Sequence, residues 1–439
     1  MTAPQPQATG LARRLGVFDA TMIVMGGIIG AGIFRNPSVV AQHLTAPSRM
    51  LGVWLVGGLI ALTGAFVYAE LAQRRPEVGG QYAYIRDAFH PMVAFLYGWG
   101  LLLVTQTGGM AAVAMTFADY LRELAGLDMN RSAVAVGTLL ILTAINCLGV
   151  RSGSNVQSAL MVTKIGAIVM LVIFGWRAAD SANFAPPSGN SSGNSLAAMV
   201  PVLFAFGGWQ TASFVSGEMR NPERDLPRGL LFGVLGVIVL YVAVSLVCVL
   251  ALGPVQLAQT STPASDVMRL VLGANGARLM AAGIAVSTVG FLSQGMLTAP
   301  RVYYAMARDG LFFKRVGSLG ERSRAPVVAI ALQGVWASII VLFFGVYGPV
   351  LNYVVSLDAV FFGLTGAALL VFRRRDPARV AGMGMPGHPW TTGVFVLAFW
   401  TLAASTIVQF PKDAGMGVLL LLLGVPVYFF WRRRGAVGG

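Results

Sequence analysis

Three ionisable side chains lie within or beside long apolar runs of the sequence, where a charge has few polar neighbours. Lys164 and Asp358 stand inside such runs, and Arg35 directly follows the run that ends at Phe34. A charge that leaves water must be paired, hydrogen-bonded or in contact with a ligand. These residues therefore indicate an ion pair, a bound cation or a group that transfers protons.

The other reactive side chains do not form a catalytic group. His43, His90 and His388 fall at the edges of apolar runs, and Cys147 and Cys248 lie inside them. No nucleophile stands with a histidine base, and the cysteines lack the spacing of metal ligands. We therefore expect no enzyme, no metal site and no cofactor.

The composition is that of a polytopic membrane protein. Of the 439 residues, 56% are hydrophobic and only 11% are charged, whereas soluble domains have about 25% charged residues. The mean hydropathy is +0.73. The net charge of +14 would suit nucleic-acid binding, but the basic residues gather in short clusters between apolar runs. Such clusters orient a protein in a membrane, so we expect a lipid bilayer and no nucleic acid as partner.

Apolar runs long enough to cross a bilayer, which takes about 20 helical residues, occur twelve times. They lie at residues 17–43, 50–72, 91–121, 132–150, 156–177, 196–219, 228–252, 277–307, 326–346, 349–373, 391–410 and 415–432. The third and eighth runs are long, so their helices are tilted or extend beyond the bilayer. The predicted fold class is an all-α membrane protein with 12 transmembrane helices.

Lysines and arginines are distributed unevenly between the two sides of these spans. With a cytoplasmic N-terminus, 21 of the 31 lie on the cytoplasmic side and seven outside, while Arg35, Lys164 and Arg301 lie within spans. An excess of basic residues marks the cytoplasmic side. We therefore predict cytoplasmic tails at residues 1–16 and 435–439.

Two spans contain glycine-rich stretches that indicate broken helices. Residues 26–34 hold four glycines, and residues 204–209 hold two more. Glycine adopts non-helical dihedral angles at little cost, and a break at bilayer depth exposes backbone groups that need a polar cavity or a ligand. Close helix packing through Gly26 and Gly30 is the alternative. Two such stretches together favour a binding site.

The order of these features indicates an inverted repeat. The interrupted spans are the first and the sixth, and each begins a set of five. Because five is odd, the second set has the opposite orientation, which places the two breaks opposite one another near the midplane. We predict a first repeat at 17–177, an external loop at 178–195, a second repeat at 196–373 and two further helices at 391–434.

Several motifs, in order along most of the chain, resemble the amino acid–polyamine–organocation superfamily and, within it, bacterial members of the L-type amino acid transporter family. Residues 30–34 are similar to its first-helix break, and residues 204–210 to its sixth-helix break. The loop at 217–228 resembles the acidic, Asn-Pro and basic-Leu-Pro pattern that follows the sixth span. Residues 76–84 and 301–310 also fit the family.

This resemblance implies the leucine-transporter fold, which alternates between outward-open and inward-open states, and an α-amino acid as cargo. Helix N-termini attract carboxylates, and helix C-termini attract ammonium groups. We expect the N–H groups at 30–32 to bind the substrate carboxylate, and carbonyls near residue 28 and at 204–206 to bind its amino group. The predicted substrate-binding residues are Ile28, Gly30, Ala31, Gly32, Phe204, Ala205, Phe206, Gly207 and Gln210.

Lys164 lies 13 residues after Arg151, which is about 20 Å along a helix from its cytoplasmic end. By the resemblance, this lysine replaces a sodium ion and ties the first helix to the eighth. That implies contacts with Gly26, Gly27 and Ser287, and transport without sodium. A lysine that only holds helices together, and a lysine that changes its protonation, both stay open.

Phe204 is matched by the resemblance to an aromatic residue that closes over the substrate, with ordinary packing as the alternative. Trp209 is assigned to the same gate, where it would support the break. Gln210 stands where relatives have an asparagine, and its amide is longer.

Four further ionisable residues have two interpretations each. Arg35 lines the external vestibule or faces polar neighbours. Asp358 is a proton carrier or lies near a water-filled opening. Glu70 and Glu218 form ion pairs at an inner gate or are solvated helix ends.

Together these features predict a sodium-independent transporter of neutral L-amino acids in the plasma membrane, the inner membrane of a bacterium, that works by exchange. A proton-coupled symporter is the alternative, and a sensor without transport is a remote one. The two breaks contain no carboxylate, which argues against cationic amino acids or polyamines as substrates. Asp358, outside the breaks, is the one carboxylate that keeps this option open.

Vertebrate members of the family join a glycoprotein through a cysteine between the third and fourth spans. Residues 122–131 contain none, so we expect no covalent heavy-chain partner.

Overall fold

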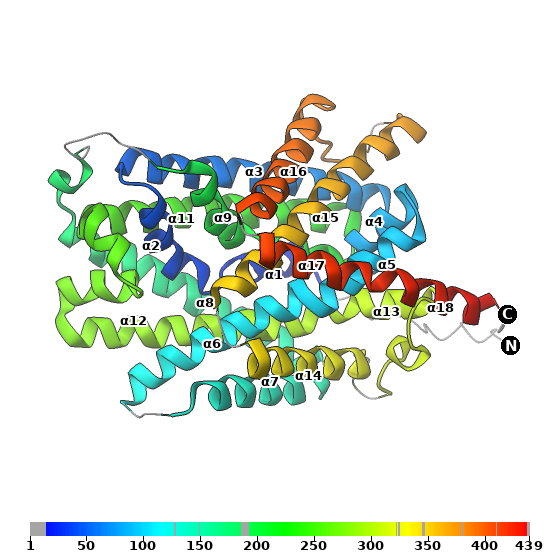
Figure 1. The fold of residues 1–439 in the computed structure, drawn as a ribbon, viewed down its shortest axis with the longest axis horizontal. Coiled ribbons are helices and arrows are strands. Elements are labelled where there is room, and N and C mark those ends of the chain that lie inside the picture. The colour runs from blue at the N-terminus through cyan, green and yellow to red at the C-terminus, as the bar shows by residue number, and fades with distance from the viewer. Residues whose placement is uncertain are drawn as a thin grey trace, which may run out of the picture.

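The computed structural model describes residues 15–126, 129–148, 150–185, 193–321, 323, 325–344, 347–378, 380, 382–409 and 411–436. This part of the chain is α-helical, with short 3₁₀ and π segments and two isolated β-bridges. The helices pack together as one bundle (Figure 1). Most of the predicted tail at 1–16, the centre of the predicted loop at 178–195 and the last three residues of the chain lie outside the described residues.

The helices follow the predicted spans closely, with breaks inside several of them. Their bounds are α1 Val17–Ile28, α2 Gly32–His43, α3 Pro47–Arg74, α4 Gln81–Ala88, α5 Pro91–Gly100, α6 Gln106–Ala125, α7 Arg131–Cys147, α8 Val150–Gly175, α9 Ser195–Phe206, α10 Thr211–Phe214, α11 Pro222–Gln259, α12 Pro263–Thr298, α13 Pro300–Arg308, α14 Val327–Phe344, α15 Tyr347–Arg375, α16 Trp390–Gln409, α17 Pro411–Leu422 and α18 Gly424–Ala436.

Many of these helices are long and apolar enough to cross a membrane. Nine such runs lie in the described part of the chain, and the bent pair α1 and α2 raises the number to ten if it is one span. Two shorter apolar helices, α7 and α14, coincide with the predicted spans at 132–150 and 326–346. The prediction of an all-α, multi-pass membrane protein is confirmed, and the count of twelve spans stays a prediction.

Proline marks where several helices begin. The helices α3, α5, α11, α12 and α13 each have proline at the first or second helical position. Its fixed φ angle suits the first turn, where its missing N–H group would have had no partner within the helix. For α11 this start lies at Pro222, six residues before the predicted span at 228–252.

Two of the observed helices continue past a bound of the predicted span, and each is kinked at a glycine near that bound. The run α11 contains a kink at Gly253, where φ is 69°, and α12 contains one at Gly273, where φ is 64°. These kinks lie next to the predicted span ends at residues 252 and 277. Positive φ angles are strained for residues with a side chain, so glycine is the residue type that permits these bends.

The two longest helices, α11 and α12, each pack against several others. The helix α11 packs against α1 and α3, and α12 packs against α6 and α8. The helices α7 and α14 lie side by side along one edge, and α18 runs next to α5 (Figure 1). The two broken helices are held between these elements, because α2 contacts α9 and α1 contacts α10.

Candidate functional site

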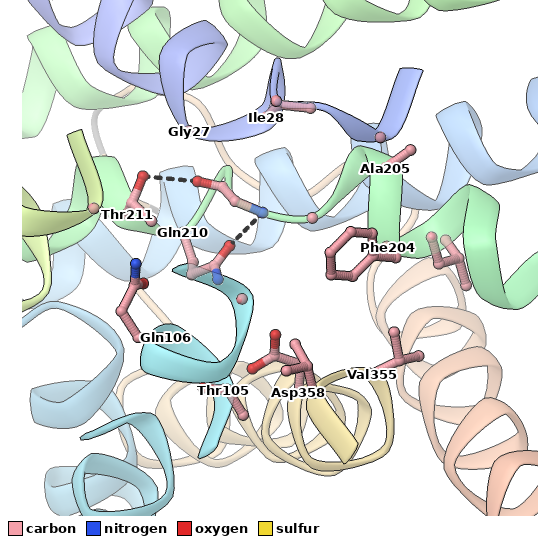
Figure 2. A pocket seen from close by; sticks show the side chains of 18 of the residues that line it. Gly27, Ile28, Thr105, Gln106, Phe204, Ala205, Gln210, Thr211, Val355 and Asp358 are labelled. Atoms are coloured by element: carbon pink, nitrogen blue, oxygen red, sulfur yellow. Dashed lines mark hydrogen bonds between the residues drawn. The ribbon is translucent and has the colours of Figure 1, made fainter. Parts of the chain in front are cut away.

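A cavity of about 90 Å³ lies where the two broken helices meet. Its wall is built from both breaks, from the start of α6, and from parts of α12, α15 and α16. Figure 2 shows the two breaks on one side of this space and the residues of α6 and α15 on the other. The structure thus brings together segments that are about 180 residues apart in the sequence.

The first break separates α1 from α2. The two helices are bent by 41°, and Ile29 has extended dihedral angles that end α1. Among the described residues, the N–H groups of Gly30, Ala31 and Gly32 form no backbone hydrogen bond outside the helices. Three unpaired donors and the positive end of the α2 dipole therefore lie at the cavity wall.

The second break separates α9 from the short helix α10. Gly207 ends α9, and Gly208 follows with a φ angle of 112°. The Gly208 N–H group donates to Gln210 Oε1 at 3.0 Å, and Thr211 Oγ1 donates to the Gly208 carbonyl at 2.8 Å (Figure 2). These local bonds satisfy the turn, and the Gly207 N–H group donates to the Leu203 and Phe204 carbonyls at the end of α9.

The two breaks present opposite partial charges to one space. The N-terminus of α2 carries a positive partial charge, and the C-termini of α1 and α9 carry negative ones. A zwitterion needs both, one for its carboxylate and one for its ammonium group. The arrangement is suited to the part that all α-amino acids share.

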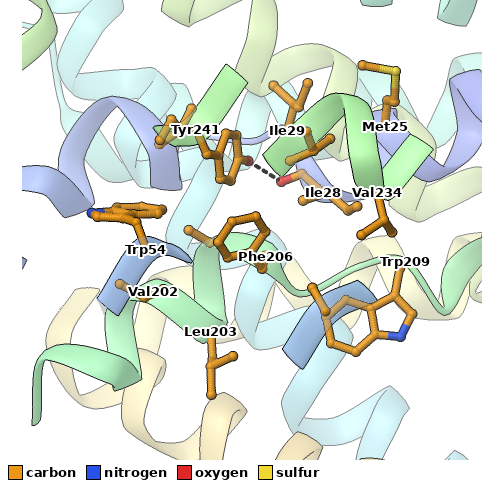
Figure 3. Close-up of a cluster of buried hydrophobic side chains, with 14 of the residues drawn as sticks. Met25, Ile28, Ile29, Trp54, Val202, Leu203, Phe206, Trp209, Val234 and Tyr241 are labelled. Atoms are coloured by element: carbon orange, nitrogen blue, oxygen red, sulfur yellow. Dashed lines mark hydrogen bonds between the residues drawn. The ribbon is translucent and has the colours of Figure 1, made fainter. Parts of the chain in front are cut away.

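Eight of the nine predicted substrate-binding residues line this cavity. They are Ile28, Gly30, Ala31, Gly32, Phe204, Ala205, Gly207 and Gln210. Phe206 does not, because its ring points into a buried cluster with Trp54 and Tyr241, at centroid distances of 5.9 and 5.1 Å (Figure 3). In that cluster, Tyr241 Oη donates to the Ile28 carbonyl at 3.0 Å, so one acceptor position of this carbonyl is already used.

The two predicted gate residues lie in different surroundings. Phe204 is half-buried at the cavity and packs against Ala112 and Val354. Trp209 is fully buried and stacks on Phe362 at 4.8 Å, which places it behind the cavity wall. Of the two predicted gate residues, Phe204 lines the cavity and Trp209 does not.

Lys164 is fully buried and joins α8 to the first break. Its Nζ donates to the Ile29 carbonyl at 2.8 Å and lies 3.5 Å from the Gly26 carbonyl. The Ser287 hydroxyl is buried and, within the described residues, has no hydrogen-bond partner. A methyl group at Gly290 would lie 2.8 Å from Lys164 Cε, so the side chain passes closely over α12 on its way to α1.

The remaining predicted residues divide between cavity and periphery. Asp358 lines the cavity. Arg35 is half-buried, does not line it and interacts with other residues of the chain. Glu218 is buried and pairs with Arg301 at 2.9 Å, and Glu70 is buried and pairs with arginines of α3 and α15. Both glutamates are thus ion-paired.

Sequence reasoning missed four polar residues at the cavity, Thr105, Gln106, Thr211 and Gln294. Thr105 and Gln106 lie where five residues of π-helix, Leu101–Thr105, interrupt the third span. Such π-bulges often mark functional sites. Gln294 of α12 donates to Thr211 Oγ1 at 2.9 Å and to the Ile23 carbonyl at 3.2 Å, which links α12 to both broken helices. The polar run at 105–107 within an apolar span was the available signal.

A sequence model described as amino acid permease matches residues 15–425, nearly the whole chain. The chain belongs to the amino acid permease family. The resemblance to the amino acid–polyamine–organocation superfamily and its L-type branch is thereby confirmed. The break regions, the cavity and Lys164 all lie within the matched part of this permease.

Curated relatives of the permease are transporters that match along nearly all of its length. It is 28% identical to the serine/threonine exchanger SteT of Bacillus subtilis, over 97% of this chain and 98% of that protein. It is 28% identical to the large neutral amino acids transporter small subunit 2 of Homo sapiens, over 97% of this chain and 82% of that protein. It is 27% identical to the Asc-type amino acid transporter 1 of Mus musculus, over 98% of this chain and 83% of that protein.

Proposed function

We propose that this permease moves neutral L-amino acids across the plasma membrane by alternating access, as a sodium-independent exchanger. The observation that carries the proposal is the single cavity bordered by the N-terminus of α2 and the C-termini of α1 and α9. It offers separate positions for a carboxylate and an ammonium group. The relatives, one an exchanger by name and another a transporter of large neutral amino acids, support the same substrate class.

The proposed architecture has twelve spans with a five-plus-five inverted repeat at 17–177 and 196–373. Helix pairing supports it, since α3 packs on α11, α6 on α12 and α7 on α14. In the repeat these are the second, third and fourth spans of each half, each paired with its counterpart. Alternating access then consists of motion of one set of helices around a fixed midplane cavity. Both termini would be cytoplasmic.

Sodium independence rests on Lys164. Its ammonium group lies against the Ile29 and Gly26 carbonyls, next to the first break. A positive charge held there by a covalent side chain does what a bound sodium ion would do for these carbonyls. The bond also holds the break in one conformation, which would make sodium unnecessary for substrate binding.

Exchange and proton symport make different predictions for purified protein in liposomes. Vesicles are loaded with unlabelled alanine or with buffer, and uptake of labelled alanine is followed without sodium, with and without an inward proton gradient. An exchanger shows uptake that requires internal amino acid and does not respond to the gradient. Concentrative uptake into buffer-loaded vesicles, driven by protons, would replace exchange with symport. Absence of uptake with any amino acid would contradict transport itself.

The proposed partners are a small amino acid and the surrounding lipid. The chain segment between α6 and α7 contains no cysteine, so a disulfide to a second subunit through this segment is not proposed. The permease is proposed to act without a covalent heavy chain.

A further inference from the structure

Asp358 is the one charged residue among the described residues that line the cavity. It lies on α15, across the space from the two breaks, and Figure 2 shows its carboxylate directed into this space. No ion pair joins it to another described residue, whereas Glu70, Glu218 and Asp309 are all paired with arginines. Its charge is therefore available to whatever occupies the cavity.

The surroundings of Asp358 contain further polar groups, because the buried side chains of Tyr68 and Tyr97 interact electrostatically with its carboxylate. Thr105 is 5% exposed, and its side chain interacts with the Asp358 carboxylate. Within the described residues, the Thr105 hydroxyl has no hydrogen-bond partner of good geometry. Gln106 follows on the same wall, and Val355 and Ala359 complete it with apolar surface. This wall can accept a hydrogen bond from a group in the cavity.

The orientation of a bound amino acid follows from the opposite wall. Its carboxylate and ammonium groups are matched to the backbone of the two breaks, so its side chain must point away from them. That direction leads to α6 and α15, where Thr105 and Asp358 lie (Figure 2). The polar groups that a short side chain can meet there are Thr105, Gln106 and the Asp358 carboxylate, which forms no ion pair with another described residue.

We propose that Asp358 is a specificity-determining residue that accepts a hydrogen bond from an O–H or N–H donor on the substrate side chain. The permease would then select small amino acids with such a donor, threonine and serine in particular, over apolar ones of equal size. This inference rests on the proposed transport function. Its physical basis is that a half-buried acceptor at the cavity loses water contacts when an apolar side chain occupies the cavity and offers it no donor.

Threonine and valine test this directly, because they have nearly the same shape and differ by one hydroxyl group. Exchange of each is measured in proteoliposomes for the wild type and for Asp358→Asn and Asp358→Leu. Asp376→Asn, an exposed acid just beyond the end of α15, is the matched control. Serine against alanine repeats the comparison, and 2,3-diaminopropionate tests an ammonium donor in place of the hydroxyl.

The wild type and Asp376→Asn should prefer threonine to valine by about tenfold or more, as expected for a hydrogen bond to a charged acceptor. Asp358→Leu should bring the ratio near one while valine exchange persists, and Asp358→Asn should fall between them. If Asp358→Leu does not reach the membrane, the test uses Asp358→Asn and a second measurement. This measurement compares how far threonine and valine each raise the melting temperature of the wild type in detergent.

An unchanged threonine-to-valine ratio in both Asp358 variants would overturn the inference. So would a wild type that exchanges both amino acids equally well, or an Asp358→Asn variant that loses only a response to protons. In each of these cases the proposed transport function stands. A wild type that exchanges none of these amino acids would instead overturn the transport function and the inference together.

Discussion

Gly27 and Gly208 pack backbone against backbone where the two broken helices cross. A methyl group at Gly208 would lie 2.1 Å from the Gly27 carbonyl oxygen, and one at Gly27 would lie 2.6 Å from the Gly208 carbonyl oxygen. Gly208 also has a φ angle of 112°, which disfavours any residue with a side chain. The contact between the breaks therefore requires glycine on both sides.

Gly208→Ala should reduce exchange strongly and destabilise the protein. The backbone conformation alone costs about 1–2 kcal/mol for a residue with a Cβ atom, and the overlap with Gly27 adds to it. Thermal unfolding in detergent and exchange in liposomes measure the two effects. Gly137→Ala in α7, where a methyl group would meet nothing within 4 Å, is the control and should behave like the wild type. A Gly208→Ala variant with normal exchange would contradict close packing of the breaks.

Lys164→Met should abolish exchange or nearly so, because it leaves the Ile29 carbonyl without its buried donor. An unsatisfied buried group costs about 1–3 kcal/mol, and here the cost falls on the conformation of the first break. Lys412→Met removes an exposed lysine and serves as the control. Exchange is measured with and without sodium. Normal sodium-free exchange by Lys164→Met would show that the charge is dispensable.

Phe204→Ala and Phe206→Ala should have different effects, although the residues are two positions apart. Phe204 is half-buried at the cavity, so its loss should raise the KM for exchange about tenfold or more with a small change in melting temperature. Phe206 is fully buried, and its truncation should cost about 3–5 kcal/mol of stability. Equal effects of the two variants on KM would argue against a gating role for Phe204.

Breaking the buried ion pair of Glu218 and Arg301 should be costly. Both side chains are at least 91% buried, so Glu218→Gln leaves an unpaired buried charge and should cost about 3–5 kcal/mol. The double variant with Arg301→Met should recover part of this loss. The partly exposed pair of Asp119 and Arg131 is the comparison, where Asp119→Asn should cost at most about 1 kcal/mol. Melting temperatures of the three variants give the result, and equal losses from Glu218→Gln and Asp119→Asn would contradict it.

Much of the architecture was predictable because the bilayer restricts what a sequence can do. Long apolar runs must form helices, since backbone groups find no water in hydrocarbon. For the same reason, glycine-rich stretches in two such runs indicated breaks, and the structure places both breaks at one cavity. Lys164 stood out because a lysine far from the ends of an apolar helix needs a partner.

The direction of each side chain was harder to predict. Successive helical residues are rotated by about 100°, so Phe204 and Phe206 point in directions about 200° apart and cannot both face the cavity. From the sequence, both residues were predicted to bind the substrate. The packing of α9 against α3 places Phe206 between Trp54 of α3 and Tyr241 of α11. Phe204 instead packs against α6 and α15.

By itself, the sequence determined the class of protein, its two broken helices and the depth of its buried lysine, because these depend on local composition along one helix. Only the tertiary structure decided which side chains share the cavity. Thr105 and Asp358 are about 250 residues apart in the chain, and they meet because α6 and α15 pack against each other across from the breaks. Such a meeting depends on how several helices are rotated at once, which local periodicity does not specify.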